Sequence, residues 1–259
     1  MAFPNRGYTS QLYYTISSEK MFVCDNKNVA IMRLVAFRKC LSILYKLEVN
    51  MDVRTVIWKR KSCRMFEKKE ITLEYQKEIL RAAQQAPSPK NEQPWRFIVV
   101  TDAETKEKLA TILSDQVRKL KIDNEKKGIN RVDLDFATES VKIIRQAPML
   151  VFVYMNMEKI VYHEDGVRWK LCAKDVECTN IMAVGAAIEN MLLRATDMGI
   201  DSLWMGDIFY AYNELVEFLK IDGEMMAAIA LGYGKDTSKK RERKPLSSII
   251  KMYGKNAED

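Results

Sequence analysis

Residues 71–100 constrain the fold of this chain most strongly, because a helix pattern and a strand pattern flank a stiff loop. The predicted helix spans residues 71–85, with Thr72 as its candidate N-cap. Its apolar face comprises Leu73, Ile79, Leu80 and Ala83. The apolar, β-rich residues 97–100 predict a buried strand.

The loop between these two elements combines prolines with polar side chains. Pro87, Pro89 and Pro94 restrict backbone rotation and lower the entropy of the loop. Between them stand Ser88, Asn91, Glu92 and Gln93, which offer hydrogen-bond donors and acceptors. A stiff polar loop between packed elements is suited to holding a ligand, and an ordinary capped turn is the alternative.

A cluster of cations follows a helix predicted over residues 53–61, whose inward positions are Val53, Val56 and Ile57. The cluster comprises Arg60, Lys61, Ser62 and Arg64. Cations are favourable at the negative end of a helix dipole, but a basic cap needs only one. Three cations and a hydroxyl within five residues therefore indicate a bound anion such as phosphate.

A second basic run, residues 239–244, lies near the other end of the chain and includes Arg241 and Arg243. If folding brings these arginines to Arg60 and Lys61, the four cations form a phosphate clamp, because arginine binds phosphate through paired hydrogen bonds. A solvated basic loop or a nucleic-acid patch is the alternative reading of this run.

The remaining patterns predict further helices over residues 103–120, 137–146, 176–198 and 212–219, and strands over residues 149–155, 201–207 and 226–231. The continuous apolar run 149–155 is typical of a central strand. The charged residues 119–131 predict a mobile loop, a lid over the site or a plain solvated loop.

The helix predicted over residues 176–198 carries small residues that permit close packing, which is typical of a core or dimer helix. These are Ala183, Gly185, Ala186 and Ala187. Gly199 is the residue expected to end this helix.

The composition is that of a globular protein, with 47% apolar and 30% charged residues. The net charge of +7 is spread along the chain without an aromatic-interleaved basic motif, so we predict no nucleic-acid partner. Five cysteines without CxxC spacing predict reduced thiols in a cytoplasmic protein. The single histidine, His163, argues against a histidine-rich metal site and a Ser-His-Asp hydrolase, so we predict no metal.

Residues 1–50 carry none of these motifs, and we predict that they are an extension of uncertain role before a domain over residues 51–259. The apolar run 29–49 is too short and too charged to span a bilayer, and it fits a signal peptide poorly. The extension could instead be a mis-assigned start, which N-terminal mass analysis of the native protein would test.

Four segments, in this order, resemble the FMN-dependent nitroreductase family. They are Arg60-Lys61-Ser62-Cys63-Arg64-x-Phe66, then Pro87-Ser88-x-x-Asn91-x-Gln93-Pro94-Trp95, then residues 198–206, which end in Met205-Gly206, and finally residues 231–234 with Arg241-x-Arg243-x-Pro245. Each segment is weak evidence alone, whereas the ordered set is specific and covers about residues 53–253.

The resemblance implies an α+β fold, in which helices flank a central, mostly antiparallel sheet, and a homodimer that exchanges its C-terminal tails. It also implies noncovalent FMN, held by the residues of these motifs: Arg60, Lys61, Ser62, Arg64, Pro87, Ser88, Asn91, Gln93, Met205, Gly206, Arg241 and Arg243. Arg64 would lie at the pyrimidine edge of the flavin. Family members often carry an acidic residue at the position of Met205, so this chain departs from the pattern there.

The implied activity is hydride transfer from NADH or NADPH to flavin N5, followed by reduction of a nitroaromatic, quinone or similar electron-poor acceptor in a ping-pong cycle. No protein residue need then serve as general acid or nucleophile. A specialised enone reductase or reductive dehalogenase of the same family is one alternative. A basic, non-catalytic binding protein is another.

Overall fold

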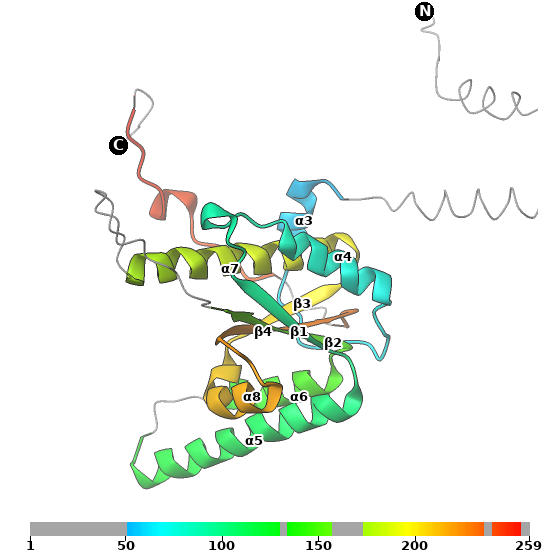
Figure 1. The fold of residues 1–259 in the computed structure, drawn as a ribbon, viewed down its shortest axis with the longest axis vertical. Coiled ribbons are helices and arrows are strands. Elements are labelled where there is room, and N and C mark those ends of the chain that lie inside the picture. The colour runs from blue at the N-terminus through cyan, green and yellow to red at the C-terminus, as the bar shows by residue number, and fades with distance from the viewer. Residues whose placement is uncertain (1–50, 130–133, 157–172, 236–239, 255–259) are drawn as a thin grey trace, which may run out of the picture. The chain divides into compact units, whose positions relative to one another are not determined.

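Four antiparallel strands form the centre of the computed structural model, which describes residues 51–129, 134–156, 173–235 and 240–254. Their bounds are Trp95–Val100 for β1, Met149–Met155 for β2, Asp201–Met205 for β3 and Glu224–Gly232 for β4. Their order across the sheet is β1-β2-β4-β3, so β2 and β4 are central and β1 and β3 are edges (Figure 1).

Helices cover both faces of this sheet (Figure 1). One side carries α3 (Val53–Lys59), α4 (Leu73–Gln84) and α7 (Ala173–Asp197), and the other carries α5 (Ala103–Lys126), α6 (Asp135–Gln146) and α8 (Tyr212–Leu219). The described residues also form 3-10 turns at η1 (Pro89–Asn91), η2 (Asp207–Ala211) and η3 (Leu246–Ser248). The predicted α+β class, with helices flanking an antiparallel sheet, is confirmed, whereas tail exchange between subunits stays a prediction.

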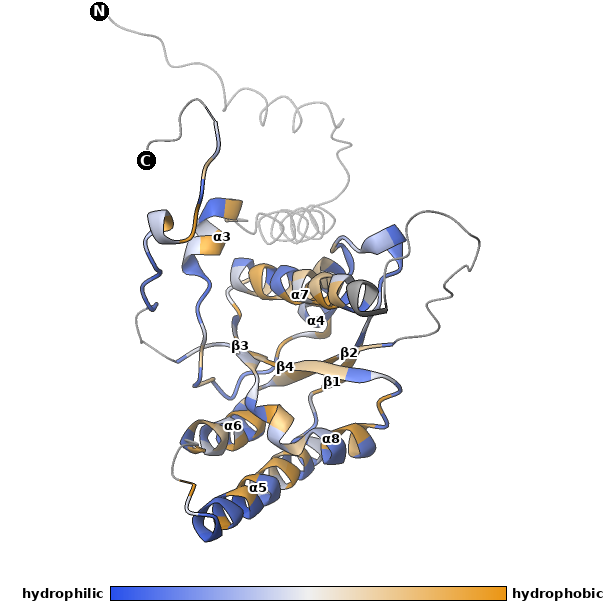
Figure 2. Cartoon of the chain, turned by 90° about the vertical axis from the view of Figure 1, so that its left-hand side faces the viewer, coloured by the Kyte–Doolittle hydropathy of each residue, from blue (hydrophilic) through white to orange (hydrophobic). Residues whose placement is uncertain are grey.

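Burial on both faces explains the continuous apolar run of β2. Phe152 packs into the core shared with α5, α6 and α8, whereas Val151 and Val153 pack into the core shared with α4 and α7. All three side chains are fully buried. Figure 2 shows the same arrangement from the side, with the hydrophobic surfaces of the helices turned toward the sheet. The predicted central strand is therefore confirmed.

β1 confirms the strand predicted after the loop but corrects its burial. Phe97 and Ile98 are only half-buried, and Val99 is 36% exposed. The cause is the position of β1 at the sheet edge, where β2 is its one strand partner among the described residues.

Side-chain caps fix the start of several helices. Thr72 Oγ1 accepts a hydrogen bond from Tyr75 N at 3.3 Å, which confirms the predicted N-cap of α4. Asp102 caps α5 in the same way through Thr105 N at 2.7 Å. At the end of α7, Gly199 has a φ of 72°, which a residue without Cβ adopts at low cost, and its predicted role is confirmed.

α7 has an inward face and an outward face. Val184, Ile188 and Met191 are buried against the sheet and α4. On the outward face, Ile181 is 39% and Met182 is 65% exposed. The predicted long amphipathic helix is thus confirmed, with one apolar flank left uncovered within the described residues.

The loop or lid predicted over residues 119–131 is wrong in its first part, because α5 continues to Lys126. Leu120 packs against the core beside α6, and Lys121 Nζ contacts Asp135 Oδ1 and Thr138 Oγ1, both at 3.3 Å. These contacts and the good helix propensity of leucine, lysine and glutamate extend the helix through a segment that is mostly charged.

The predicted inward face of α3 is only partly right. Val56 is buried, but Val53 is 73% and Ile57 is 42% exposed. The helix also ends at Lys59, so that Arg60 is its C-cap. Leu73, predicted on the apolar face of α4, likewise points outward. Within the described residues the main neighbour of α3 is α7, and Val56 is the one residue of α3 that is buried.

Candidate functional site

The loop between α4 and β1 has a backbone held by its own polar groups. Ser88 Oγ accepts a hydrogen bond from Gln93 N at 3.0 Å and so closes the loop across η1. Lys90, Asn91 and Gln93 have φ values of 49°, 59° and 49°. Residues with a Cβ seldom adopt this left-handed region, and such strain concentrates at functional sites. The geometry favours a ligand loop over an ordinary capped turn.

The side chains of this loop remain available for contacts. Pro87 and Asn91 are exposed, and Ser88 and Gln93 are half-buried. Gln93 Nε2 makes only a long contact of 3.5 Å, to Asn91 O. Because η1 packs against α7, the loop presents these groups beside that helix.

The segment after α3 runs along the outer edge of β3 as an irregular strip. Ser62 forms a parallel bridge with Ser202, and Cys63 N donates to Ser202 O at 2.9 Å. Further on, Lys235 N donates to Met65 O at 2.9 Å. The motif that sequence places at an anion site is therefore fixed to the sheet on both sides of Arg64.

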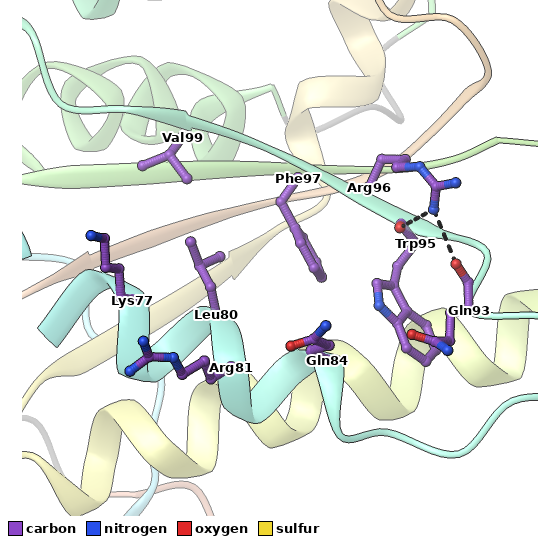
Figure 3. Close-up of a pocket in the computed structure, with 9 residues that line it drawn as sticks. All are labelled: Lys77, Leu80, Arg81, Gln84, Gln93, Trp95, Arg96, Phe97 and Val99. Carbon is purple, nitrogen blue, oxygen red and sulfur yellow. Dashed lines mark hydrogen bonds between the residues drawn. The ribbon is translucent and has the colours of Figure 1, made fainter. Parts of the chain in front are cut away.

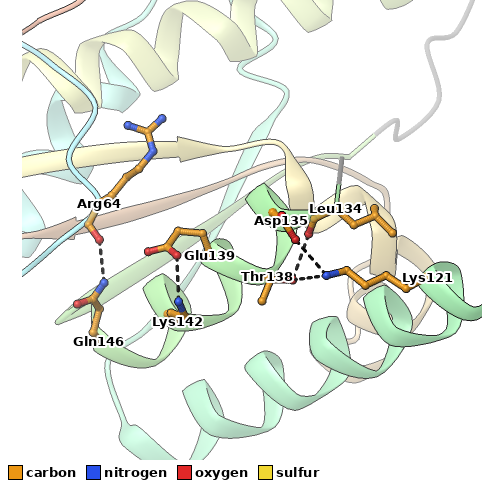
Figure 4. A network of polar contacts seen from close by, with 8 residues as sticks. All are labelled: Arg64, Lys121, Leu134, Asp135, Thr138, Glu139, Lys142 and Gln146. Atoms are coloured by element: carbon orange, nitrogen blue, oxygen red, sulfur yellow. Dashed lines mark hydrogen bonds and ion pairs between the residues drawn. The ribbon is translucent and has the colours of Figure 1, made fainter. Parts of the chain in front are cut away.

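Arg64 combines an anchored backbone with an exposed side chain. Its carbonyl oxygen accepts a hydrogen bond from Gln146 Nε2 at 2.8 Å, and its guanidinium points away from Gln146 (Figure 4). No ion pair to this guanidinium occurs among the described residues. Arg64 therefore carries a positive charge that no described carboxylate neutralises.

Cations from both ends of the described chain meet at the C-terminal end of α3. Lys240 Nζ donates to Ile57 O at 3.0 Å and to Trp58 O at 3.1 Å. Burial of the ammonium, and then repulsion by Arg60 and Arg243, lowers the pKa of Lys240, whereas Glu189 raises it.

We call Arg60, Lys240 and Arg243 the cationic cluster. Its one described counter-charge is Glu189 on α7, whose Oε1 lies 3.7 Å from Arg60 Nε. The repulsion by Arg60 and Arg243 adds to burial, the larger cause, in lowering the pKa of Lys240. Three cations beside a single described carboxylate leave excess positive charge. This is the electrostatic condition for binding a phosphate group.

The structure treats the other predicted cations differently. Lys61 is half-buried and Arg241 is exposed. Sequence reasoning did not single out Lys240, although it lies in the basic run. Lys240 is marked out by its contact with carbonyl groups near the end of α3. That contact depends on how the folded chain brings residue 240 back to this helix, which the sequence does not show.

The end of β3 is close to the predicted arrangement. Met205 is buried, so its side chain belongs to the core and only its backbone can face a ligand. At Gly206 the space in which a Cβ would stand has no heavy atom within 4 Å. The strand ends at Met205 rather than at residue 207, because Asp207 begins η2 and accepts a hydrogen bond from Ser140 Oγ at 2.7 Å.

The groups predicted to share one ligand come together only in part. Arg60 and Arg243 meet in the cationic cluster, and Ser62 and Arg64 lie on the strip beside β3. Among the described residues, no hydrogen bond or ion pair joins the loop at Pro87–Gln93 to the cationic cluster. The described polar contacts of one chain thus do not link the loop to the cationic cluster.

A groove of about 510 Å³ follows β1 where it faces α4. Trp95 and Phe97 stand in it, and Arg96 hydrogen-bonds to the carbonyls of Gln93 and Trp95 (Figure 3). Lys77 and Arg81 from α4 make the opposite rim cationic. The groove combines an apolar floor with a strand edge that no described strand pairs.

The described residues contain neither a membrane-spanning helix nor a metal-binding cluster of side chains. No helix in the described ranges has the length and apolarity needed to cross a membrane. No group of three or more histidine, cysteine, aspartate or glutamate side chains in those ranges is arranged to hold a metal ion. Cys63 and Cys178 form no disulfide among the described residues. His163 and the other three cysteines lie outside the described residues, as does the whole of the extension 1–50.

The chain is similar in sequence and fold to known proteins. A protein of Archaeoglobus fulgidus with the provisional name NADH dehydrogenase/NAD(P)H nitroreductase is 29% identical over 187 residues, which cover 70% of this chain and 84% of that protein. The crystal structure of a BluB-like flavoprotein from Clostridium difficile is 27% identical, with a TM-score of 0.62, and covers 79% of this chain and 100% of its own.

A more distant structure shares the fold. The nitroreductase with bound FMN from Desulfitobacterium hafniense is 21% identical with a TM-score of 0.58, covering 79% of this chain and 99% of its own. The model of the Nitroreductase family matches residues 57–233, which include the strip, the ligand loop and the whole sheet. The chain belongs to the nitroreductase family.

Proposed function

We propose that the protein is an FMN-dependent oxidoreductase that uses NADH or NADPH to reduce a small, electron-poor acceptor such as a nitroaromatic or a quinone. The observation that carries the proposal is the cationic cluster, whose excess positive charge would be neutralised by an anionic cofactor group. When bound, FMN supplies the redox centre, taking hydride at N5 and passing electrons to the acceptor in a ping-pong cycle.

The residues of the cationic cluster fit the phosphate of FMN. Arg60 and Arg243 can each donate paired hydrogen bonds to phosphate oxygens, and Lys240 adds a point charge. A dianion placed there relieves the repulsion that lowers the pKa of Lys240. These side chains contribute affinity in both redox states, because the phosphate charge does not change during turnover.

Arg64 would act on the ring instead. Its guanidinium is exposed on the strip beside β3 and lacks a described ion pair. A fixed positive charge near the pyrimidine edge stabilises negative charge that appears there only on reduction. Gly206, which leaves open space in place of a side chain, lets the backbone at the end of β3 approach the ring.

The loop between α4 and β1 would contact the ribityl chain and the ring edge through Ser88, Asn91 and Gln93. The Ser88 hydroxyl already accepts a hydrogen bond from Gln93 N but keeps its own proton for a ligand oxygen. Asn91 and Gln93 offer amide groups on a backbone that is closed before the ligand arrives, which reduces the entropy lost on binding.

The complete site would form in a homodimer. No described hydrogen bond or ion pair joins the loop to the cationic cluster within one chain, and in our proposal two subunits supply the two parts. The apolar side chains that this interface would bury are exposed now: Ile181, Met182, Val53, Ile57, Leu246, Ile249 and Ile250. The tail with Leu246 and Ile249 would exchange onto the partner, and the groove along β1 offers an unpaired strand edge for it.

The same proposal includes a cytoplasmic location, because five cysteines without CxxC spacing are typical of reduced thiols. A specialised enone reductase or reductive dehalogenase would use the same flavin site with a different acceptor. A screen of nitroaromatic, quinone, enone and organohalide acceptors with the reduced enzyme distinguishes these activities.

The decisive experiment is purification followed by cofactor analysis. We expect a yellow homodimer that carries FMN, takes up FMN when the apoprotein is titrated, and is reduced by NADH or NADPH in stopped-flow measurements. A colourless protein that does not take up added FMN is a basic binding protein and overturns the proposal. A stable, FMN-loaded monomer at micromolar concentration in light scattering overturns the dimer.

A further inference from the structure

We propose that Gln146, the last residue of α6, is a positioning residue that orients Arg64 toward the flavin ring and so favours the reduced cofactor. The inference rests on the proposed function, because it needs FMN in the site. It adds a residue that lies outside all four motifs and on the opposite side of the sheet from α7.

The contact joins two distant parts of the sequence. Gln146 Nε2 donates to Arg64 O at 2.8 Å across a separation of 82 residues. Figure 4 shows the amide below the strip and the guanidinium of Arg64 on its other side, so the bond holds the peptide from which the charged group projects. The amide therefore acts through the backbone and leaves the guanidinium free for a ligand.

Cys63 Sγ donates to Met65 O at 3.1 Å and supports the strip beside the carbonyl of Arg64. The hydrogen bonds at Cys63 N and Met65 O fix the neighbouring residues through backbone groups of β3 and of Lys235. Among the described residues, Gln146 is the hydrogen-bond partner of the Arg64 carbonyl. Without it, the peptide between the two fixed neighbours can rotate, and the direction of the Arg64 side chain changes with it.

Gln146 is itself held rigidly. Ala147 N donates to Ile143 O at 2.9 Å and ends α6, Ala147 is fully buried, and β2 begins at Met149. Lys106 Nζ also donates to Ala147 O at 2.9 Å. The donor thus comes from the junction of a helix with the central strand, which is well suited to setting a precise direction.

The direction of Arg64 matters because its charge is not held elsewhere. Charge interactions fall with distance, and the effect on the cofactor is largest when the guanidinium stays at the ring edge. Since negative charge appears at that edge only on reduction, a displaced Arg64 weakens binding of reduced FMN more than binding of oxidised FMN.

The test compares Gln146→Met with Lys142→Met, one turn earlier on α6. Methionine keeps the length of glutamine but cannot donate, and Lys142 forms only a surface pair with Glu139 at 3.2 Å. We expect Gln146→Met to weaken reduced FMN binding about fivefold relative to oxidised FMN, the effect of losing one hydrogen bond. Lys142→Met leaves both dissociation constants at the parent values. Gln146→Asn, which is too short to reach the carbonyl, should behave like Gln146→Met.

A double variant separates positioning from a general loss of structure. If Gln146 acts through Arg64, adding Gln146→Met to Arg64→Ala changes the ratio of the two FMN dissociation constants no further. A parent-like ratio in Gln146→Met, or an undiminished effect without the Arg64 guanidinium, overturns the positioning role alone. Failure of the parent protein itself to bind FMN overturns the proposed function, and this inference with it.

Discussion

The ammonium group of Lys240 lies beside two arginines and one carboxylate, so its protonation should respond to a bound phosphate. Burial and the charges of Arg60 and Arg243 lower its pKa in the free protein. The folded chain therefore binds fewer protons than the unfolded chain just above that lowered pKa, and the stability linked to this group rises with pH there. A bound dianion raises the pKa again, so FMN binding takes up a proton in the same window.

We predict that FMN affinity is constant at neutral pH and falls as pH rises through the lowered pKa of Lys240. Fluorescence titration of the apoprotein with FMN from neutral pH to about pH 10 measures this. In Lys240→Met the affinity is lower throughout and this part of the pH dependence is lost. Protonation of the flavin itself affects both proteins equally, so it cancels when their pH profiles of FMN affinity are compared. Identical profiles in the two proteins would remove Lys240 from the phosphate site.

Arg64 and Arg243 provide a second comparison between single side chains. We predict that Arg64→Ala slows flavin reduction more than it weakens FMN binding, and that Arg243→Ala mainly weakens FMN binding. The loss in each case is on the order of 1.5–3 kcal/mol, as for a charged hydrogen bond. FMN titration of each apo-variant, with the reduction rate measured at saturation, checks this. Equal losses of affinity with parent reduction rates would place Arg64 away from the ring.

Two methionines of α7 test whether its inward face belongs to the core and its outward face to the dimer interface. Met191 is fully buried, whereas Met182 is 65% exposed. We predict that Met191→Ala lowers the free energy of unfolding by about 2–5 kcal/mol, the usual cost of a large core truncation. We predict that Met182→Ala leaves the core intact but raises the dimer dissociation constant. Urea denaturation and sedimentation at several protein concentrations separate the effects, and equal effects of the two changes on unfolding would contradict the assigned faces.

Local chemistry explains which elements could be predicted from sequence. Thr72 and Gly199 act through their own side chain or backbone, so the helix ends that they mark follow from nearby residues alone. The helix at Tyr212–Leu219 has the predicted bounds because its apolar spacing is regular. β2 is recognisable because both its faces are buried, which leaves no polar alternation.

The predictions that differ from the structure concern residues whose conformation or exposure is set by tertiary contacts. α5 passes through its charged segment because α6 supplies Asp135 and Thr138 as partners for Lys121. Val53 and Ile57 are exposed because the main packing of α3 in the described residues, against α7, buries Val56 instead. In the candidate site, sequence supplied Arg60 and Arg243, but Lys240 and Gln146 depend on which segments meet across long separations.

At the scale of the whole molecule, the motifs and the described site lie between Arg60 and Pro245, and the matched family region is residues 57–233. Asp52 caps α3 through Thr55 N at 3.1 Å, and Met51 N donates to Asp197 Oδ1 at 2.8 Å. A protein that begins at Met51 therefore keeps the cap of its first described helix. Residues 1–50 contribute no motif to the proposed site.

We accordingly predict that deleting residues 1–50 leaves the FMN dissociation constant and the turnover rate close to those of the full chain. The physical reason is that the core, the strip, the ligand loop and the cationic cluster are all built from later residues. FMN titration and steady-state kinetics of the full and truncated proteins are the measurement, with circular dichroism as the control for folding. A well-folded truncated protein that no longer binds FMN would show that the extension is part of the site. Misfolding of the domain could not then explain the loss of the cofactor.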